Sequence, residues 1–525
     1  MKVVTSEQMQ LLDAEAIHSH GVPGLELMER AGRQSAALIM TEYSELASPK
    51  ALVLAGKGNN GGDGYVVARL LGEKGWLVKV VVLVGREEIQ GDAAVNLNRL
   101  PEQIELAFCR DEAAVTHCLQ DLAPYSVIVD ALFGTGLTHP VAGRYRLAID
   151  TVNTADRPVV AIDIPSGIHG TTGKVLGTAL HADLTVTFAI AKLGHVLYPG
   201  AAHAGRIKVV DIGIPSEIIA SAPGYEFVDR DVAANIIKPR GRSTHKGNFG
   251  HCLIIAGSTG HTGAASLAAS GAVRSGAGLV SLAIPASLNS ILETKTTEAM
   301  TLPCCDNGQG YFAEVAASEL LDALSGKNIV MFGPGISRQG ETISLVKRLV
   351  REISLPMVID ADGLNALAEE PSVLLKTRSP SIVITPHPGE MARLVNLSVA
   401  EVEADRIGIA REFASQYQVV VVLKGARTVI ATPSGEVSIN GSGNPGMASG
   451  GMGDVLAGLL TSLIGQGYPP YEACQLGVFV HGLAADIVAR EKGEIGITAS
   501  DIAESLPIAF KELFDHKMHW PEEVT

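Results

Sequence analysis

The chain has 525 residues with a formal net charge of −15; 46% of the residues are hydrophobic, 4% are aromatic and 57 are glycine. This length is too great for one hydrophobic core, so we expect two domains, residues 1–225 and 226–525, of the α/β type in which buried parallel strands are rich in Val, Ile and Leu. The negative charge argues against nucleic acid or an anionic membrane as the main partner, but phosphorylated small molecules stay compatible because they bind locally at loops and helix ends.

The amino-terminal residues MKVVTSEQMQLLDAEA lack the apolar core of a signal peptide. The six cysteines include no CxxC pair, so they predict neither a zinc site nor a redox motif, and scattered thiols are typical of a reducing compartment. The uncharged stretch between Lys246 and Arg274 is interrupted by Gly, Ser, Thr and His, which favours a strand, a loop and a buried helix over a membrane span. We therefore expect a cytoplasmic protein without a membrane partner.

Two helical segments come first. Apolar residues recur at helical spacing in 7–20 and in 25–42, and both segments precede any strand. We expect these helices to pack outside the sheet or against a partner subunit of a homo-oligomer.

The first strand, 51–55, runs into the glycine-rich turn GKGNNGGDG at 56–64 and then into a helix. Strand, glycine turn and helix are the setting in which backbone N–H groups bind phosphate. The turn satisfies GxGxxG, but the next strand, 77–84, is followed by glycine and arginine and not by the acidic residue that holds a ribose. This argues against an ordinary nicotinamide dehydrogenase. The extra asparagines and aspartate are either turn residues or oxygen donors for a cation or a polar ligand.

The next strands each end near a polar side chain. Residues 126–129 run into Asp130, residues 159–162 into Asp163, and residues 184–188 precede Lys192. A single Asp after a strand is more often a helix cap than a catalyst. Because carboxyl ends of parallel strands meet at one edge of a sheet, however, several such groups predict a site there. The candidates are Asn60, Asp130, Asp163, Ser166 and Lys192.

The motifs GKGNNGGDG, DALFGTG, DIPSG and FAIAKLGHVLYPG together resemble the NAD(P)H-hydrate epimerases, the N-terminal part of the bifunctional NAD(P)H-hydrate repair enzyme family. The resemblance covers residues 1–220 and implies a Rossmann-like three-layer αβα domain. It also implies binding of the hydrated dinucleotide by Asn59, Asn60, Gly61, Gly62, Asp63, Gly134, Thr135, Gly136, Leu137, Thr138, His139 and Pro140.

The same resemblance implies a potassium ion bound by Asn60, Asp130 and Ser166, although spacing alone does not distinguish K⁺ from Na⁺ or Mg²⁺. It implies that Asp163 contacts the substrate and that Lys192 is the second member of an acid–base pair, whose pKa values a shielded cleft can tune. The sequence departs from the commoner pattern at Lys57, and no proline follows the lysine in AIAKLG.

A Gly/Pro/Ser-rich stretch at 211–223 ends the first half. Strand 251–256 then leads through GSTGHTG into helix 264–275, which is either a plain βα turn or a second anion-binding loop. Strands 329–332, 356–359, 382–385 and 419–423 follow, and each ends in glycine or polar residues. Alternation of this kind predicts a second α/β domain.

Two residues after these strands are candidates for ligand contact. His387 lies between two prolines, so it is held stiffly and is no helical core residue. Lys424 beside Gly425 offers charge and bare backbone to a phosphate chain, although a lone Lys would count for little.

Residues 441–458, GSGNPGMASGGMGDVLAG, are dense in glycine and carry one charge, Asp454, directly before an apolar helix. Bare N–H groups at the positive end of a helix make an anion site. Asp454 is then either a cap of the helix or a general base aimed at a phosphate acceptor. The entropic cost of ordering so much glycine favours a loop that a ligand approaches closely.

GPG, DADGLNAL, TPHPGE, KGART and GGMGDVLAG resemble the ribokinase-like carbohydrate kinases and, more closely, their NAD(P)H-hydrate dehydratase branch, over residues 226–510. The resemblance implies a ribokinase-like α/β domain that uses Mg²⁺ and ADP, although the residues do not separate ADP from ATP. It implies substrate contacts from Ala265, Gly335, His387 and Asp454. Nucleotide contacts are implied from Lys424, Gly425, Ala426, Arg427, Thr428 and Gly453.

Together the two resemblances imply an enzyme that interconverts the R and S forms of hydrated NADH and NADPH and dehydrates the S form at the expense of ADP. Asp454 would take the proton of the C6 hydroxyl, and the 450–453 amides would stabilise the transferred phosphoryl group. Two alternatives are a small-molecule kinase fused to a non-catalytic dinucleotide-binding module, and a nicotinamide oxidoreductase, which the missing ribose acid weakens.

Overall fold

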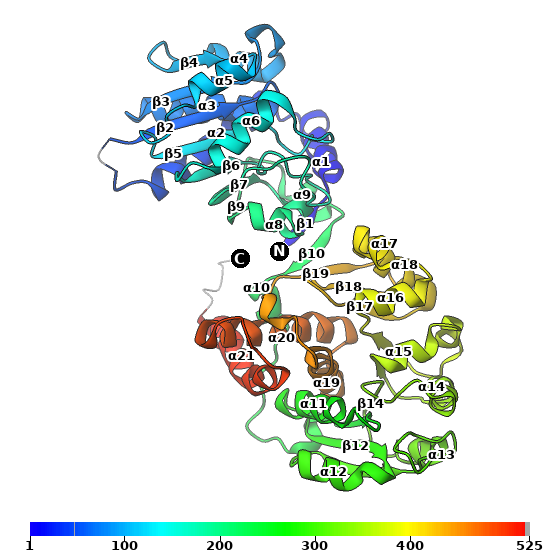
Figure 1. The fold of residues 1–525 in the computed structure, drawn as a ribbon. Coiled ribbons are helices and arrows are strands. Elements are labelled where there is room, and N and C mark those ends of the chain that lie inside the picture. Colours follow the sequence, from blue (N-terminus) through cyan, green and yellow to red (C-terminus); the bar gives the residue numbers. More distant parts are fainter. Residues whose placement is uncertain (47, 520–525) are drawn as a thin grey trace. The chain divides into compact units, whose positions relative to one another are not determined.

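The computed structural model describes residues 1–46 and 48–519. It divides into two compact units, Lys2–Tyr225 and a second unit that begins at Glu226 and also takes in Met1 (Figure 1). All helices and strands predicted above are present, with boundaries that differ by a few residues.

The first unit contains β1 (Lys2–Val4), α1 (Ser6–His18), α2 (Gly24–Glu42), β2 (Lys50–Ala55), α3 (Asn59–Glu73), β3 (Leu77–Val82), η1 (Arg86–Glu88), α4 (Gly91–Asn98), β4 (Glu105–Phe108), α5 (Glu112–Cys118), β5 (Val127–Ala131), α6 (Gly143–Asn153), β6 (Val159–Ile162), β7 (Leu184–Phe188), β8 (Ala191–Lys192), α7 (Leu193–Val196), α8 (Gly200–His203), β9 (Arg206–Val210) and α9 (Ser216–Ser221).

Its main sheet has the order β4-β3-β2-β5-β6-β7-β9, and every pair in it is parallel. Alternate strand residues pack on opposite faces: Val53 and Val80 lie with residues of α2 and α3, whereas Leu54 and Val81 lie with residues of α5 and α6. This confirms the predicted three-layer αβα domain. The chain leaves β2 toward β3 on one side and reaches β5 on the other, so a crevice for ligands is expected where β2 and β5 end.

Helices α1 and α2 pack outside the main sheet, against other helices of the first unit, as one of the two predicted alternatives had it. A Cβ at Gly32 of α2 would come within 2.4 Å of the Val66 Cβ on α3, so the two helices pack backbone to side chain. Strand β1, which precedes α1, pairs in parallel with β8 and sets Val4 opposite Lys192. Both helices are therefore integral to the first unit.

The prediction of a glycine-rich turn over the whole of 56–64 is wrong. Helix α3 begins at Asn59 after the N-cap Gly58, so NNGGDG forms the first turns of a helix and not a loop. A Cβ on Gly61 would lie 2.2 Å from the Gly56 carbonyl oxygen, and one on Gly64 would lie 2.6 Å from the Ala131 Cβ. The glycines let the start of α3 press against the ends of β2 and β5.

The second unit contains β10 (Tyr225–Val228, which begins at the boundary), α10 (Arg230–Ile236), η2 (Lys246–Phe249), β11 (His251–Ile255), α11 (Thr262–Arg274), β12 (Leu279–Pro285), η3 (Ala286–Leu288), α12 (Asn289–Lys295), β13 (Met300–Cys304), α13 (Ala316–Asp322), β14 (Ile329–Phe332), α14 (Gly340–Glu352), β15 (Met357–Ile359), α15 (Asp362–Leu367), η4 (Pro371–Lys376), β16 (Ile382–Ile384), α16 (Pro388–Val395), α17 (Val399–Ala404), α18 (Arg406–Tyr417), β17 (Val420–Leu423), β18 (Val429–Ala431), β19 (Val437–Asn440), η5 (Pro445–Met447), α19 (Met452–Gly465), α20 (Pro470–Lys492) and α21 (Ala499–His519).

Its sheet runs β13-β12-β11-β14-β15-β16-β17-β18-β19-β10. The pairs from β13 to β17 are parallel, and β18 is antiparallel to both of its neighbours. Helices α11, α19, α20 and α21 pack on one face in one apolar cluster, and α14 and α15 lie on the other side of the strands (Figure 1). This arrangement agrees with the predicted ribokinase-like α/β domain.

Helix α19 is fixed by close contact with α11. A Cβ on Gly458 would lie 2.0 Å from the Ala268 carbonyl oxygen, and one on Gly271 would lie 2.4 Å from that of Val455. The two helix backbones therefore touch, which makes the start of α19 a rigid platform. Among the described helices, α20 alone has the length and apolar composition of a membrane span, and 83% of that span is buried inside the unit, as in a core helix.

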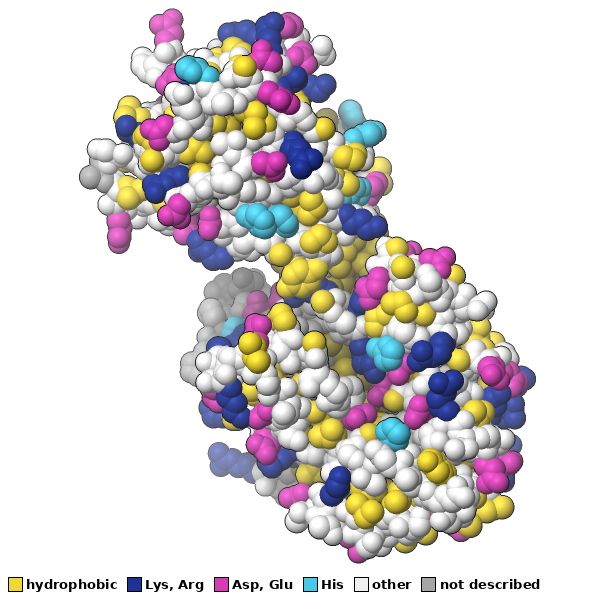
Figure 2. Space-filling view, in the orientation of Figure 1, with side chains coloured by type: hydrophobic (Ala, Val, Ile, Leu, Met, Phe, Trp, Pro, Cys, Tyr) yellow, Lys and Arg dark blue, Asp and Glu magenta, His cyan; other side chains and the backbone are white. Residues whose placement is uncertain are grey.

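On the face drawn in Figure 2, Lys and Arg side chains alternate with Asp and Glu over both units. The described residues offer no broad basic surface on this face, which agrees with the net charge of −15.

Candidate functional site

The carboxyl ends of β2 and β5 carry a cluster of oxygen atoms in the first unit. Asn60, the second residue of α3, donates from Nδ2 to the Phe133 carbonyl at 3.0 Å. Its Oδ1 is buried without a hydrogen-bond partner. Fully buried Asp130 accepts from the Ser166 backbone N–H at 2.7 Å and from its hydroxyl at 2.6 Å. Burial raises the pKa of Asp130 to about 6, despite these bonds.

Asn60, Asp130 and Ser166 are thus brought together around Phe133, as the sequence predicted for a cation site. The donors are an orphaned amide oxygen, a carboxylate, a hydroxyl and a backbone carbonyl. The described residues contain no cluster of three His, Cys, Asp or Glu for a metal. A set of mostly neutral oxygens suits a hard cation of low charge better than zinc or another transition metal.

Asp163 and Lys192 form a buried ion pair beside this cluster. The Lys192 ammonium donates to Asp163 Oδ1 at 2.7 Å, to Thr187 Oγ1 at 2.9 Å and to the Phe188 carbonyl at 3.2 Å. The two side chains are only 2% and 13% exposed. Burial alone would raise the pKa of Asp163, but the charge of Lys192 outweighs it and holds that pKa below its usual value. Asp163 is therefore ionised at neutral pH.

His195 fixes the backbone of this pair. Its Nδ1 accepts the Lys192 backbone N–H at 3.0 Å, so Nε2 carries the proton and donates to the Asp163 carbonyl at 2.8 Å. Burial lowers the pKa of His195 to about 4, which keeps it neutral. Asp163 has φ = 65°, a left-handed conformation that non-glycine residues seldom adopt. Sequence reasoning missed His195, although its position three residues after Lys192 was a usable signal.

The predicted dinucleotide-binding residues divide into an inner and an outer group. A Cβ on Gly134 would lie 3.4 Å from the Asn60 Cβ and 3.5 Å from Asp163 Oδ2, so this glycine passes directly over the cation cluster and the ion pair. The inner, partly or fully buried group is Asn60, Gly61, Gly62, Asp63, Gly134, Thr135 and Leu137, and the exposed group is Asn59, Gly136, Thr138, His139 and Pro140.

Asp63 is buried on α3, and its charged neighbours are Asp163, Asp13 and Lys192. Burial and the other carboxylates raise its pKa well above the usual value. Asp13 reaches this group from α1, and burial raises its pKa to about 6. Sequence reasoning missed Asp13, because nothing in the spacing of α1 shows that β1 brings the helix beside Lys192.

In the second unit, Asp454 is the third residue of α19, and the N-cap is Gly451. The N-cap is therefore not Asp454, and the capping alternative is wrong. Burial, and next to it the charge of Asp360, raises the pKa of Asp454 to about 7. A carboxylate with this pKa is half ionised near neutral pH and is well suited to accept a proton from a substrate.

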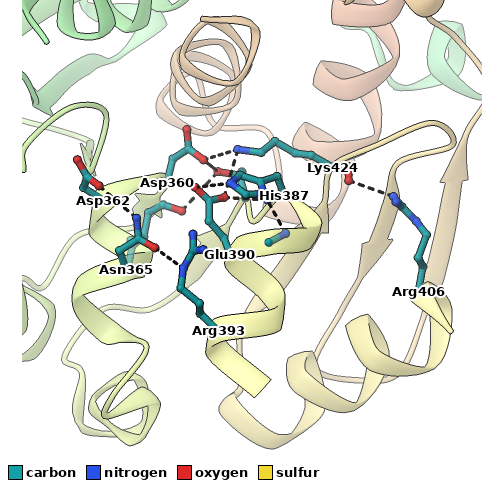
Figure 3. A network of polar contacts seen from close by, with 11 residues as sticks. Asp360, Asp362, Asn365, His387, Glu390, Arg393, Arg406 and Lys424 are labelled. Atoms are coloured by element: carbon teal, nitrogen blue, oxygen red, sulfur yellow. Dashed lines mark hydrogen bonds and ion pairs between the residues drawn. The ribbon is translucent and has the colours of Figure 1, made fainter. Parts of the chain in front are cut away.

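Asp360 and Lys424 are the centre of a buried polar network (Figure 3). Lys424 Nζ lies 2.6 Å from Asp360 Oδ1 and 3.8 Å from Glu390 Oε2. Thr385 also donates to Asp360 Oδ1, at 2.7 Å. Burial would lower the pKa of Lys424, but Asp360 and Glu390 raise it, so Lys424 is charged.

Lys424 meets the start of α19. A Cβ on Gly453 would lie 3.2 Å from Lys424 Nζ and 3.8 Å from Asp360 Oδ2. The ammonium and the N–H groups at the helix start therefore present positive charge at one place, which favours an anion. Asp360 and Glu390 belong to the motifs DADGLNAL and TPHPGE, but sequence reasoning missed their roles in this network.

His387 is the N-cap of α16, where its Nδ1 accepts the Gly389 N–H at 3.0 Å. Glu390 completes the capping box by accepting the His387 N–H at 2.8 Å. The His387 side chain is 51% exposed and its Nε2 lies 3.4 Å from Glu390 Oε1. As predicted, it is stiff and outside the core, and its exposed edge is open to a ligand.

Hydrogen bonds from Arg406 and Thr428 fix the backbone of the predicted nucleotide-binding segment, residues 424–428. Arg406 donates to the carbonyls of Leu423 and Lys424 at 3.0 and 3.1 Å (Figure 3), and Thr428 donates to that of Gly425 at 3.0 Å. Gly425 has φ = 146°, and both it and Ala426 are exposed. Bare backbone is thus presented outward next to a charged lysine.

The remaining predicted residues are Arg427, between β17 and β18, and Gly335 and Ala265, which follow β14 and β11. Arg427 donates to the Gly441 carbonyl at 2.7 Å. Gly335 has φ = 60°, and a Cβ there would lie 2.6 Å from the His261 Cβ and 3.2 Å from the Ala264 Cβ. Ala265 follows directly, buried in α11.

Two family models match the chain. The model described as NAD(P)H-hydrate dehydratase matches residues 252–508, and the model described as YjeF-related protein N-terminus matches residues 24–194.

Full-length relatives match both units. The bifunctional NAD(P)H-hydrate repair enzyme Nnr of Moorella thermoacetica is 42% identical over 519 residues, covering 98% of this chain and 97% of the relative. The enzyme of the same name from Escherichia coli is 36% identical over 498 residues, covering 94% and 91%. Among solved structures, ADP/ATP-dependent NAD(P)H-hydrate dehydratase of Bacillus subtilis, co-crystallised with ATP/Mg²⁺, is 29% identical with a TM-score of 0.49 and covers 55% of this chain and 99% of its own.

Proposed function

Because the chain belongs to the family of bifunctional NAD(P)H-hydrate repair enzymes, we propose that its two units act in turn on one damaged coenzyme. The first unit epimerises the R and S forms of hydrated NADH and NADPH, and the second dehydrates the S form at the expense of ADP. The observation that carries this function is the position of Asp454. This half-buried carboxylate has a pKa of about 7 and lies near the Lys424 ammonium, at the start of a helix that opens with glycine.

The chemistry follows from the substrate. The hydrate carries a hydroxyl on C6 of the ring, next to N1, and hydroxide is a poor leaving group. Asp454 accepts the hydroxyl proton as the oxygen takes a phosphoryl group from ADP. The N–H groups at the start of α19 and the Lys424 ammonium stabilise the charge of that group. Phosphate then departs with the electron pair of the C6–O bond while the N1 lone pair forms a C6–N1 double bond. Loss of a proton from C5 to water then forms the C5–C6 double bond and returns the electron pair to N1, which restores the dihydronicotinamide.

The other predicted residues surround this reaction. His387, Gly335 and Ala265 are proposed to contact the hydrate, and the 424–428 backbone with Gly453 to contact the nucleotide. In the first unit, the inner loop residues are proposed to hold the same dinucleotide over the Asp163–Lys192 pair. The Lys192 ammonium donates its three N–H groups to Asp163, Thr187 and Phe188 within the protein. Its proposed role is therefore to keep Asp163 ionised.

A magnesium ion fits the second site. The carboxylates of Asp360 and Glu390 both lie within 4 Å of the Lys424 ammonium. After burial, the charge of Asp360 raises the pKa of both Glu390 and Asp454. Mg²⁺ is usually held by one or two carboxylates together with nucleotide phosphates and water. Asp360 and Glu390 are the proposed protein contacts, and the ion supplies charge neutralisation to the phosphates.

A potassium ion fits the first site, since the orphaned Oδ1 of Asn60 adds an oxygen to those of Asp130 and Ser166. We expect K⁺ to raise the unfolding temperature of the first unit and Li⁺, which is too small for the cluster, to have little effect. At about 100 times its Kd, a bound ion contributes about 2.7 kcal/mol by mass action. Asp130→Asn should abolish the difference between the two salts. Equal melting in K⁺ and Li⁺ at the same ionic strength would show that the cluster does not select K⁺.

The proposed activity is tested by the absorbance of reduced nicotinamide. Hydrated NADH mixed with the chain, ADP and Mg²⁺ should regain this band completely, and the same mixture without ADP should not. A small-molecule kinase predicts the opposite result, which is a stable phosphorylated product and no recovery of the band. That result would overturn the proposal.

For cellular context, we propose a cytoplasmic enzyme whose partners are the hydrated dinucleotides and ADP, without nucleic acid or membrane, and assembled as a homo-oligomer. The six thiols, which are all free, support a reducing compartment.

A further inference from the structure

The first site contains a buried acid that the ion pair does not use. Asp63 is 8% exposed. Its pKa is shifted by burial and by neighbouring charges, and no hydrogen bond to its carboxylate is found among the described residues. It lies three residues after Asn60 on α3, so the two side chains share a helix face. Asn60 lies against Phe133 and Gly134, and this face is therefore turned toward the proposed dinucleotide loop.

Asp163 has the opposite environment. Its Oδ1 accepts from Lys192 and from Thr187, while Oδ2 faces Gly134 at 3.5 Å from the point where a Cβ would sit. One carboxylate of the site is thus held ionised by an ammonium, and the other is 8% exposed and has no ammonium bonded to it among the described residues. Paired carboxyl groups whose surroundings push their pKa values apart are the usual basis of acid and base roles.

We propose that Asp63 is the proton donor of the epimerisation and that Asp163 is the carboxylate that accepts the returning proton. This inference rests on the proposed epimerase function and assigns a role to each group in it. The elevated pKa of Asp63, caused by burial and by Asp163 and Asp13, keeps it protonated where Asp163 is ionised.

The step balances without any further reactant. Asp63 gives its proton to the C6 hydroxyl, the C6–O bond breaks with its electron pair leaving on water, and the N1 lone pair forms a C6–N1 double bond. A water molecule then adds to the other face of C6, and its proton passes to Asp163. The reverse reaction uses the two carboxyl groups in exchanged roles.

The test compares Asp63→Asn with the matched control Asp13→Asn in the full chain. Asp13 is also a buried carboxyl beside Lys192 and Asp163, so its removal changes the same charges. We expect Asp63→Asn to lower the epimerase kcat by about 10²- to 10⁴-fold, the usual contribution of a proton-transferring group. Asp13→Asn should lower kcat far less than Asp63→Asn and should move the alkaline fall of the rate to lower pH, because Asp13 is one of the charges that raise the pKa of Asp63. Both variants should still dehydrate the S form, which shows that the second unit is folded.

Two measurements on the wild-type chain hold even if Asp63→Asn disturbs the fold. In water labelled with ¹⁸O, each epimerised molecule should carry the label at the C6 hydroxyl. The epimerase rate should also fall on the alkaline side as Asp63, which faces Asp13, Asp163 and Lys192, loses its proton.

Retention of the original oxygen, a rate that is flat with alkaline pH, or an Asp63→Asn variant as fast as wild type would overturn the inference. In each of those cases the wild-type chain still epimerises, so the proposed function survives. A wild-type chain that does not epimerise would instead refute the proposed function itself.

Discussion

Asp454→Asn is expected to lower the dehydration rate by about 10²- to 10⁴-fold, because it removes the group that takes the hydroxyl proton while keeping the size of the side chain. Epimerisation should continue at the wild-type rate, since Asp454 belongs to the second unit. The measurement is recovery of reduced-nicotinamide absorbance from the purified S form with ADP.

The pH dependence of the dehydration rate is a second test of the role of Asp454. Asp454 must be ionised to act as a base, and its pKa is raised to about 7 by burial and by Asp360. The wild-type dehydration rate should therefore fall as pH drops through about 7. Asp362→Asn is a matched control, because Asp362 is a nearby carboxylate that acts on Asp454 only weakly and already accepts from Asn365 and Ser337. An Asp454→Asn variant that keeps most of the wild-type rate would rule out the assigned base.

Lys192→Met is expected to have the largest effect on stability. Removing one partner of a buried ion pair leaves an uncompensated charge, which typically costs about 3–5 kcal/mol. The Lys192 side chain is 2% exposed and that of Asp163 is 13% exposed, so little water is available to solvate the stranded carboxylate. Denaturant unfolding followed by the fluorescence of Trp76, a core residue of the first unit, measures the loss.

The sign of the pH effect follows from Asp163. In the wild type its folded pKa is depressed, so its contribution is present above the unfolded pKa and is lost as pH falls through the folded pKa. In the variant, burial without Lys192 raises that pKa, and the penalty disappears as acid protonates the group. The difference between the two chains should thus be greatest near neutral pH and shrink toward acid pH.

A double variant separates stability from catalysis. Lys192→Met with Asp163→Asn removes both charges, so it should recover most of the lost stability and none of the epimerase activity. If Lys192→Met alone unfolds at the wild-type denaturant concentration at neutral pH, the ion pair does not hold the site together.

Much of the fold could be predicted because buried parallel strands are runs of Val, Ile and Leu that end in glycine or polar residues. Strands β2, β5, β6 and β7 were all recognised in this way. The start of α3 could not be predicted, since a stretch so rich in glycine is typical of a loop. In the structure, Gly61 is needed because the helix backbone presses against Gly56, and such a contact has no signature in the local sequence.

The residues of the site could be predicted, but the contacts between them could not. Residues that follow strands were identified, because strand ends meet at one edge of the sheet. Their pairing was not, since Asp360 and Lys424 are 64 residues apart and are brought together by the order β15-β16-β17. Likewise, Asp13 reaches Lys192 because β1 pairs with β8, which the periodicity of α1 cannot reveal.

The most direct test of the account is the amplitude of coenzyme recovery by Asp163→Asn. With an equilibrated mixture of the two epimers, ADP and Mg²⁺, the wild-type chain should restore all of the reduced-nicotinamide absorbance in one fast phase. The variant should restore the S fraction at the same fast rate and the R fraction only as fast as it epimerises spontaneously. Complete recovery by the variant in a single fast phase would contradict the division of labour between the two units.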